Sequence, residues 1–134
     1  MSDQNFLDRL KELYPLVFKN LDDISTPVGW NDIIESASAV IEYEIQDFPE
    51  ELKELIYAVQ LKSKFGILRY YLNHTTPYID GVIAMAEKLS YLTCEDCGQK
   101  GSSRVIGTWS CTLCEKDYQK ALANKSPGRN FKNS

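Results

Sequence analysis

Two Cys-x-x-Cys pairs, Cys94/Cys97 and Cys111/Cys114, hold every cysteine of the 134-residue chain and constrain its fold more than any other feature. Thirteen residues separate the pairs. Each short turn can direct two sulfurs toward one point, and a hairpin between the turns can complete a tetrahedron of soft thiolates. The spacing predicts a zinc ribbon over residues 93–120, with one Zn²⁺ per chain bound by Cys94, Cys97, Cys111 and Cys114.

The segment between the pairs fits such a ribbon. Gly98 follows the first pair, where a tight turn favours glycine. Gly101 and Ser102 are expected to turn the chain, and Val105, Ile106 and Trp109 are typical strand residues. Because four cysteines close the coordination shell, whereas catalytic zinc normally keeps an open position, the sequence favours a structural metal.

Two other uses of paired cysteines were weighed against zinc. A redox pair of the thioredoxin kind needs a βαβ context, which the sequence does not provide. Disulfides are rare in the cytoplasm. We expect a cytoplasmic protein without membrane contact, because the N-terminus has no apolar signal segment and no apolar run approaches the roughly 20 residues of a membrane span.

The preceding part of the chain, residues 1–92, predicts an α+β domain of helices packed on a small antiparallel sheet. Apolar residues at helical spacing indicate helices within 5–21, 30–48 and 75–92. Pro15 ends or kinks the first of them, and Thr76 is a plausible cap of the third. Between the last two helices, residues 55–62 and 66–73 predict a β-hairpin.

Basic and aromatic residues gather on and after this hairpin, in a pattern that can pair a phosphate and stack a base. The candidate ligand-binding residues are Lys62, Lys64, Arg69, Tyr71, His74 and Tyr78. Strand alternation places Arg69 and Tyr71 on one face and Tyr70 on the other, so part of the set belongs to the core. The simpler interpretation of the whole set is packing plus a solvated turn.

Charge is unevenly distributed along a chain whose net charge is −4. Acidic residues dominate 1–58, which argues against nucleic-acid binding by the whole protein, because that affinity comes mainly from Lys and Arg. Basic residues dominate 88–134, which leaves a nucleic-acid contact open for the C-terminal third. Residues 121–134 are polar and basic and predict a disordered tail.

Residues 29–114 resemble a group of small uncharacterised proteins encoded by bacteriophages and prophages. The shared features are Gly29–Trp30 before a helix, the two cysteine pairs, and a hairpin motif of Lys62, Lys64, Phe65, Gly66, Leu68 and Arg69. In that group a histidine often follows the last cysteine, and here the corresponding segment, CEKDYQK, has none. The resemblance brings no established activity.

From these features we expect a non-enzymatic phage accessory protein that counters host defence, by masking a host protein or by sequestering a nucleotide signal. A zinc-ribbon regulator that binds nucleic acid is the alternative. An enzyme acting on a nucleotide through His74, Arg69 and a tyrosine is a third possibility. The oligomeric state stays open.

Overall fold

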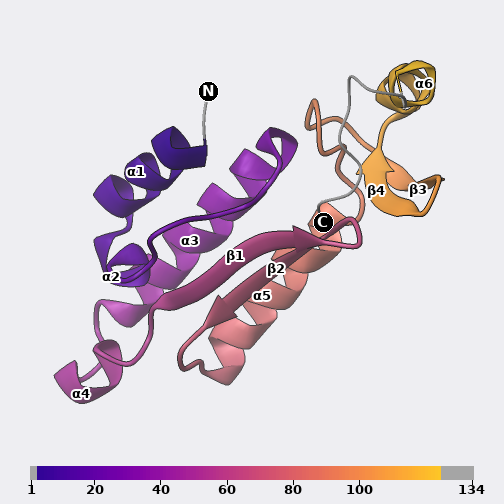
Figure 1. The fold of residues 1–134 in the computed structure, drawn as a ribbon. Helices are drawn as coiled ribbons and strands as arrows, with labels where there is room; N and C mark the ends of the chain where they lie inside the picture. The colour runs from indigo at the N-terminus through magenta and orange to yellow at the C-terminus, as the bar shows by residue number, and fades with distance from the viewer. Residues whose placement is uncertain (1–2, 125–134) are drawn as a thin grey trace.

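A computed structural model describes residues 3–124 of the chain, and within this range the fold is α+β, with six α-helices and two small antiparallel sheets (Figure 1). The first and larger unit contains, in chain order, α1 (Asp3–Leu13), α2 (Pro15–Phe18), the 3-10 turn η1 (Val28–Trp30), α3 (Asn31–Ile45), α4 (Glu50–Lys53), β1 (Ala58–Lys64), β2 (Ile67–Leu72) and α5 (Pro77–Ser90). The second unit contains β3 (Ser102–Ile106), β4 (Trp109–Leu113) and α6 (Glu115–Ala123).

The core of the larger unit is formed by the β1–β2 hairpin, by the helices α3 and α5, which pack against each other, and by apolar residues of α1 and α2. Leu61, Leu68 and Tyr70 point from the hairpin into this core. Their neighbours in the strands face away from it, as the twofold alternation of a strand requires. A hydrogen bond of 2.7 Å joins the Tyr70 hydroxyl to Ser38 on α3. The Ser90 hydroxyl on α5 accepts the Leu68 N–H at 2.9 Å.

The sequence predicted that Pro15 ends or kinks the first helix. Pro15 divides this helix into two, because proline has no N–H to continue the helical hydrogen bonds. Helix α1 ends at Leu13 and α2 begins at Pro15. The buried carboxylate of Glu42 on α3 accepts the N–H groups of Leu16 and Val17 at 3.2 and 3.0 Å. A side chain from another helix therefore satisfies amides that the first turn of α2 leaves without an internal partner.

Other predicted elements agree with the structure in kind and differ in extent. The predicted cap of α5 is confirmed, since Thr76 Oγ1 accepts the Ile79 N–H at 3.3 Å. The hairpin lies where it was expected, with shorter strands, whereas α4 was not predicted. The turn of the second hairpin lies at Gly107, not at Gly101 and Ser102, because residues 102–106 pair with 109–113 in β3 and β4.

The boundary predicted between the second unit and the tail also shifts. Helix α6 continues to Ala123, so residues 121–123 belong to the helix and not to a tail. Ala121 is buried in the second unit's core, which explains why the helix continues past residue 120. The remainder of the predicted tail, 125–134, lies outside the described residues. None of the helices within 3–124 is both long and apolar enough to cross a bilayer.

Candidate metal centre

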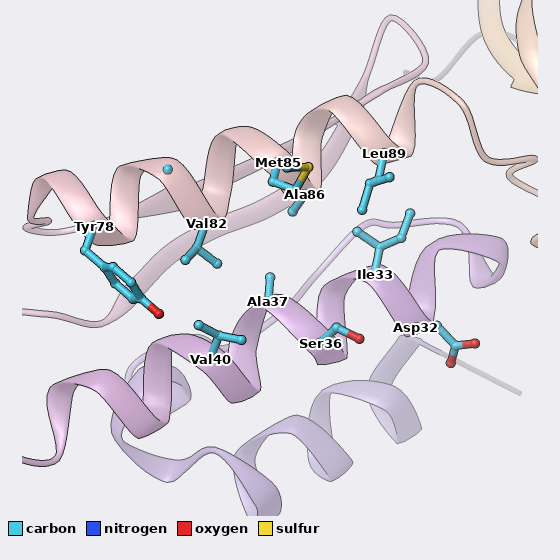
Figure 2. A pocket seen from close by; sticks show the side chains of 11 residues that line it. Asp32, Ile33, Ser36, Ala37, Val40, Tyr78, Val82, Met85, Ala86 and Leu89 are labelled. Atoms are coloured by element: carbon cyan, nitrogen blue, oxygen red, sulfur yellow. The ribbon is translucent and has the colours of Figure 1, made fainter.

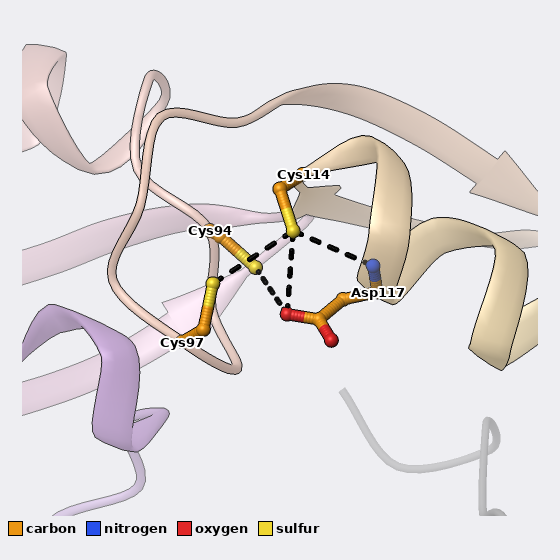
Figure 3. Close-up of side chains that lie close together, drawn as sticks. All are labelled: Cys94, Cys97, Cys114 and Asp117. Carbon is orange, nitrogen blue, oxygen red and sulfur yellow. Dashed lines mark hydrogen bonds between the residues drawn. The ribbon is translucent and has the colours of Figure 1, made fainter.

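The first half of the site is the turn that carries Cys94 and Cys97. The Cys94 carbonyl accepts the Gly98 N–H at 3.0 Å, which folds the chain back on itself. Gly98 has φ of 82°, a left-handed conformation that disfavours residues with a Cβ. The turn brings the sulfurs of Cys94 and Cys97 toward the same point (Figure 3).

The second half of the site is the start of α6. Cys114 is the cap residue of this helix, and its sulfur accepts the Asp117 N–H at 3.4 Å. Residues three apart in the first turn of a helix lie on one face. The helix start therefore places the Asp117 carboxylate beside the Cys114 sulfur, and directs both toward the Cys94–Cys97 turn.

The four ligand atoms, three sulfurs and one carboxylate oxygen, all lie within 4.8 Å of one another. The sulfurs of Cys97 and Cys114 are 3.7 Å apart. Asp117 Oδ2 lies 3.2 Å from the Cys94 sulfur and 3.4 Å from the Cys114 sulfur. Cys94 and Asp117 are buried and Cys97 is exposed. This group could hold a metal ion, with one ligand open to solvent for entry.

The electrostatics of the group suit a cation. Burial raises the pKa of the Cys94 thiol to about 12, so without a cation this sulfur keeps its proton. Hydrogen bonds from the thiols of Cys94 and Cys97 lower the pKa of the Asp117 carboxyl. Asp117 is therefore an ionised carboxylate surrounded by thiols, and a metal ion can replace the thiol protons at its side.

Cys111, the remaining predicted ligand, lies outside this group. It belongs to β4, where it pairs with Arg104, and it is buried with Ile106 and Leu113 in the core of the second unit. Three residues of extended strand span about 10 Å, so Cys111 and Cys114 do not form a tight turn like that of the first pair. The structure brings three of the four predicted cysteines together and adds Asp117 to them.

Sequence reasoning missed Asp117, although a signal for it exists. Asp117 follows Cys114 at the same spacing that separates the members of each cysteine pair. The segment after Cys114 forms the short helix α6. A cap residue and the third residue of the helix that follows it face the same side, so the segment Cys-Glu-Lys-Asp places two ligands together. Cys111 and Cys114 do not form such a pair, because one lies in a strand and the other at the start of a helix.

The segments that carry the candidate metal ligands are attached to the larger unit at two places, through backbone and side-chain hydrogen bonds. The Gly29 N–H donates to the Glu95 carbonyl at 2.8 Å, and Trp30 Nε1 donates to the Thr93 carbonyl at 2.9 Å. A Cβ on Gly29 would lie 2.1 Å from the Cys94 carbonyl oxygen, so only glycine permits this approach. Trp30 itself is fully buried, in agreement with a packing role.

The tip of the first hairpin makes the second attachment. The buried Thr112 hydroxyl donates to the Gly66 carbonyl at 2.8 Å, next to Cys111 in β4. The Gly29–Trp30 and Phe65–Gly66 segments thus both contact the cysteine-bearing part of the chain. Their place in the fold gives them a structural role at the junction between the two units.

The predicted ligand-binding residues are divided between two sides of the larger unit. Lys62, Lys64, Arg69 and Tyr71 share the hairpin face that points away from the core, as their register shows. His74 is exposed beyond the end of β2. Tyr78 lies on α5 and lines a different surface, so the six residues do not form one site.

Tyr78 lines an open groove of about 590 Å³ between α3 and α5 (Figure 2). Apart from Asp32 and Ser36 at one end, the groove is almost entirely apolar. Its other lining residues are Ile33, Ala37, Val40, Gly81, Val82, Met85, Ala86 and Leu89. The groove was not predicted from the sequence, because both helices pack their other apolar residues into the core.

Comparisons with protein-family models, with curated proteins and with solved structures find no match to this chain.

Proposed function

We propose that this protein is a zinc-binding protein in which Cys94, Cys97, Cys114 and Asp117 hold one Zn²⁺ as a structural ion. The proposal rests on the close approach of these four ligand atoms. Around tetrahedral zinc, with Zn–S of about 2.3 Å and Zn–O of about 2.1 Å, neighbouring ligand atoms lie about 3.6–3.8 Å apart. The distances of 3.2, 3.4 and 3.7 Å between pairs of ligand atoms are close to this geometry.

The ligand types favour zinc among the common divalent ions. Three thiolates select a soft or borderline metal, whereas Mg²⁺ and Ca²⁺ require oxygen ligands. Three thiolates and one carboxylate carry the same formal charge as four thiolates, so replacing a cysteine by aspartate keeps the net charge of a four-cysteine site. Four protein ligands fill the tetrahedral shell, which is the arrangement of a structural and not of a catalytic zinc.

The role of the ion in this proposal is to hold the second unit together. That unit has a small core of five buried residues, Cys94, Ile106, Cys111, Leu113 and Ala121, which is too few to fold a module of this size alone. The ion would join the turn at Cys94 to the start of α6, and the contacts at Gly29 and Gly66 would hold the loaded unit on the larger one.

The biological role that fits this structure best is non-enzymatic binding, in which the zinc-bound second unit provides a folded surface. The expectation that the partner is a host protein or a nucleotide signal, in a phage accessory role, stays a prediction that no contact described above tests.

Native mass spectrometry of protein purified without added metal, compared with its denatured mass, tests the zinc proposal. We expect one Zn²⁺ per chain in the native state and none after denaturation. A protein that binds no zinc, even after reduction and incubation with Zn²⁺, would contradict the proposal.

A further inference from the structure

A row of three polar side chains crosses the outer face of the first hairpin. Ser25 pairs with Lys62 on β1 in a parallel bridge, and Lys62 pairs with Arg69 on β2. Paired residues in neighbouring strands point to the same side of a sheet, at a spacing of about 4.8 Å between strands. Ser25 is exposed while its neighbours Ile24 and Thr26 are buried, which agrees with this orientation.

Two features of this row are unfavourable as they stand. Lys62 and Arg69 are like charges directly opposite each other, an arrangement that destabilises a strand pair. Arg69 Nε is buried and has no hydrogen-bond partner. Within residues 3–124, the ion pairs are made by Arg9 and Arg104, so no carboxylate neutralises Lys62 or Arg69. A buried donor without a partner is unfavourable, so the larger unit does not satisfy all the hydrogen-bonding capacity of the Arg69 guanidinium.

We propose that this row binds the phosphate group of a nucleotide. A hydroxyl, an ammonium and a guanidinium in one line offer the donors that a phosphate accepts, and the guanidinium can form two parallel hydrogen bonds to it. An anion between Lys62 and Arg69 would remove their mutual repulsion and accept hydrogen bonds from the terminal nitrogens of the Arg69 guanidinium.

The neighbouring residues on the same face indicate the rest of the ligand. Tyr71 lies two residues from Arg69 along β2, on the same side of the strand, and its side chain is 46% exposed. Gln60 is its partner on β1 and is also exposed. A flat aromatic side chain stacks on a base and an amide can bond to the edge of that base. The row of polar side chains and the aromatic side chain together fit a nucleotide better than an inorganic anion.

A single nucleotide fits this face better than a nucleic-acid strand. The face carries only three basic side chains, Lys62, Lys64 and Arg69, of which Lys62 and Arg69 are paired with each other. The larger unit as a whole is acidic, which opposes a backbone of many phosphates. The site does not depend on the zinc, so its failure would leave the proposed metal centre untouched.

Isothermal titration calorimetry of the full chain, as purified, tests the proposal, with AMP, inorganic phosphate and adenosine as probes. We expect AMP to bind more tightly than phosphate, and adenosine to bind most weakly. Arg69→Gln should weaken AMP binding by about tenfold or more, the loss typical of one charge-assisted hydrogen bond. Tyr71→Ala should reduce the advantage of AMP over phosphate.

A matched control and a second measurement keep the test decisive. Lys88→Gln removes one exposed positive charge on α5 and should leave AMP binding unchanged. Without ligand, Arg69→Gln should be at least as thermally stable as the wild type, because it removes an unpaired buried donor and a like-charge contact. The proposal would be overturned if neither AMP nor phosphate bound, if Arg69→Gln bound AMP normally or was destabilised without ligand, or if only longer oligonucleotides bound.

Discussion

The Asp117 carboxylate lies 3.2 Å from the Cys94 sulfur, although the two residues are 23 positions apart in the sequence. This contact joins the turn after α5 to the start of α6 and closes the loop that contains β3 and β4. An ionised carboxylate at this position completes a group of three thiols. The group that could hold a metal ion therefore combines one cysteine pair with a Cys-x-x-Asp segment, whereas the sequence predicted two cysteine pairs.

Removing the metal should unfold the second unit and leave the larger unit folded. A structural zinc of this kind contributes about 10 kcal/mol or more to folding, whereas the larger unit has a separate core. Hydrogen exchange before and after treatment with a chelator measures this. We expect the amides of β3 and β4 to lose protection while those of α3 and β1 keep theirs. Unchanged protection in β3 and β4 would contradict the account.

Gly29→Ala should weaken the junction between the two units. The added Cβ would lie 2.1 Å from the Cys94 carbonyl oxygen and 2.6 Å from Glu95 backbone atoms, so the backbone must move. We expect a loss of about 1–3 kcal/mol in the free energy of unfolding, measured with urea. Gly81→Ala is the matched control, since its Cβ meets nothing within 4 Å and it lies inside α5.

The control should gain stability, by about 0.5–1 kcal/mol, because alanine is a better helix former than glycine. If Gly29→Ala were as stable as the wild type, the close contact at Cys94 would not exist in solution.

Part of this structure could be predicted from the sequence and part could not. Periodic apolar residues predicted the longer helices and the first hairpin. Each such pattern is local, and the same apolar residues form the core. The CxxC turn at Cys94 was equally local. Asp117 was missed because its position depends on where β4 ends and α6 begins. The packing of Leu113 and Ala121 in the core of the second unit determines that boundary. Nor does any local pattern reveal that Gly29 approaches Cys94 from far along the chain.

Glu42 should make stability depend on pH. Burial raises the pKa of its carboxyl above the ordinary value of 4.5, with the N–H groups of Leu16 and Val17 opposing the shift. A raised folded-state pKa means that the folded protein binds the proton more tightly. This contribution to stability is full below pH 4.5 and is lost as the pH rises through the raised pKa. Urea unfolding at several pH values should show this slope in the wild type and a smaller one in Glu42→Gln.

Phe65→Asn should stabilise the first hairpin. Phe65 occupies a left-handed conformation with φ of 57° at the hairpin tip, followed by Gly66 with φ of 78°. Asparagine followed by glycine suits this turn, whereas phenylalanine is strained in it, and the Phe65 side chain is 61% exposed. We expect a gain of about 0.5–1 kcal/mol in urea unfolding. A loss of stability would show that the Phe65 ring makes a contact that outweighs the strain.

The most direct test of the metal centre compares zinc affinity in Asp117→Asn and in Cys111→Ala, by competition with a chromophoric chelator. We predict that Asp117→Asn binds zinc at least about tenfold more weakly, because a carboxylate ligand is lost, while Cys111→Ala keeps an affinity close to that of the wild type. If Cys111→Ala lost the zinc and Asp117→Asn kept it, the fourth ligand would be Cys111 and the centre described here would be wrong.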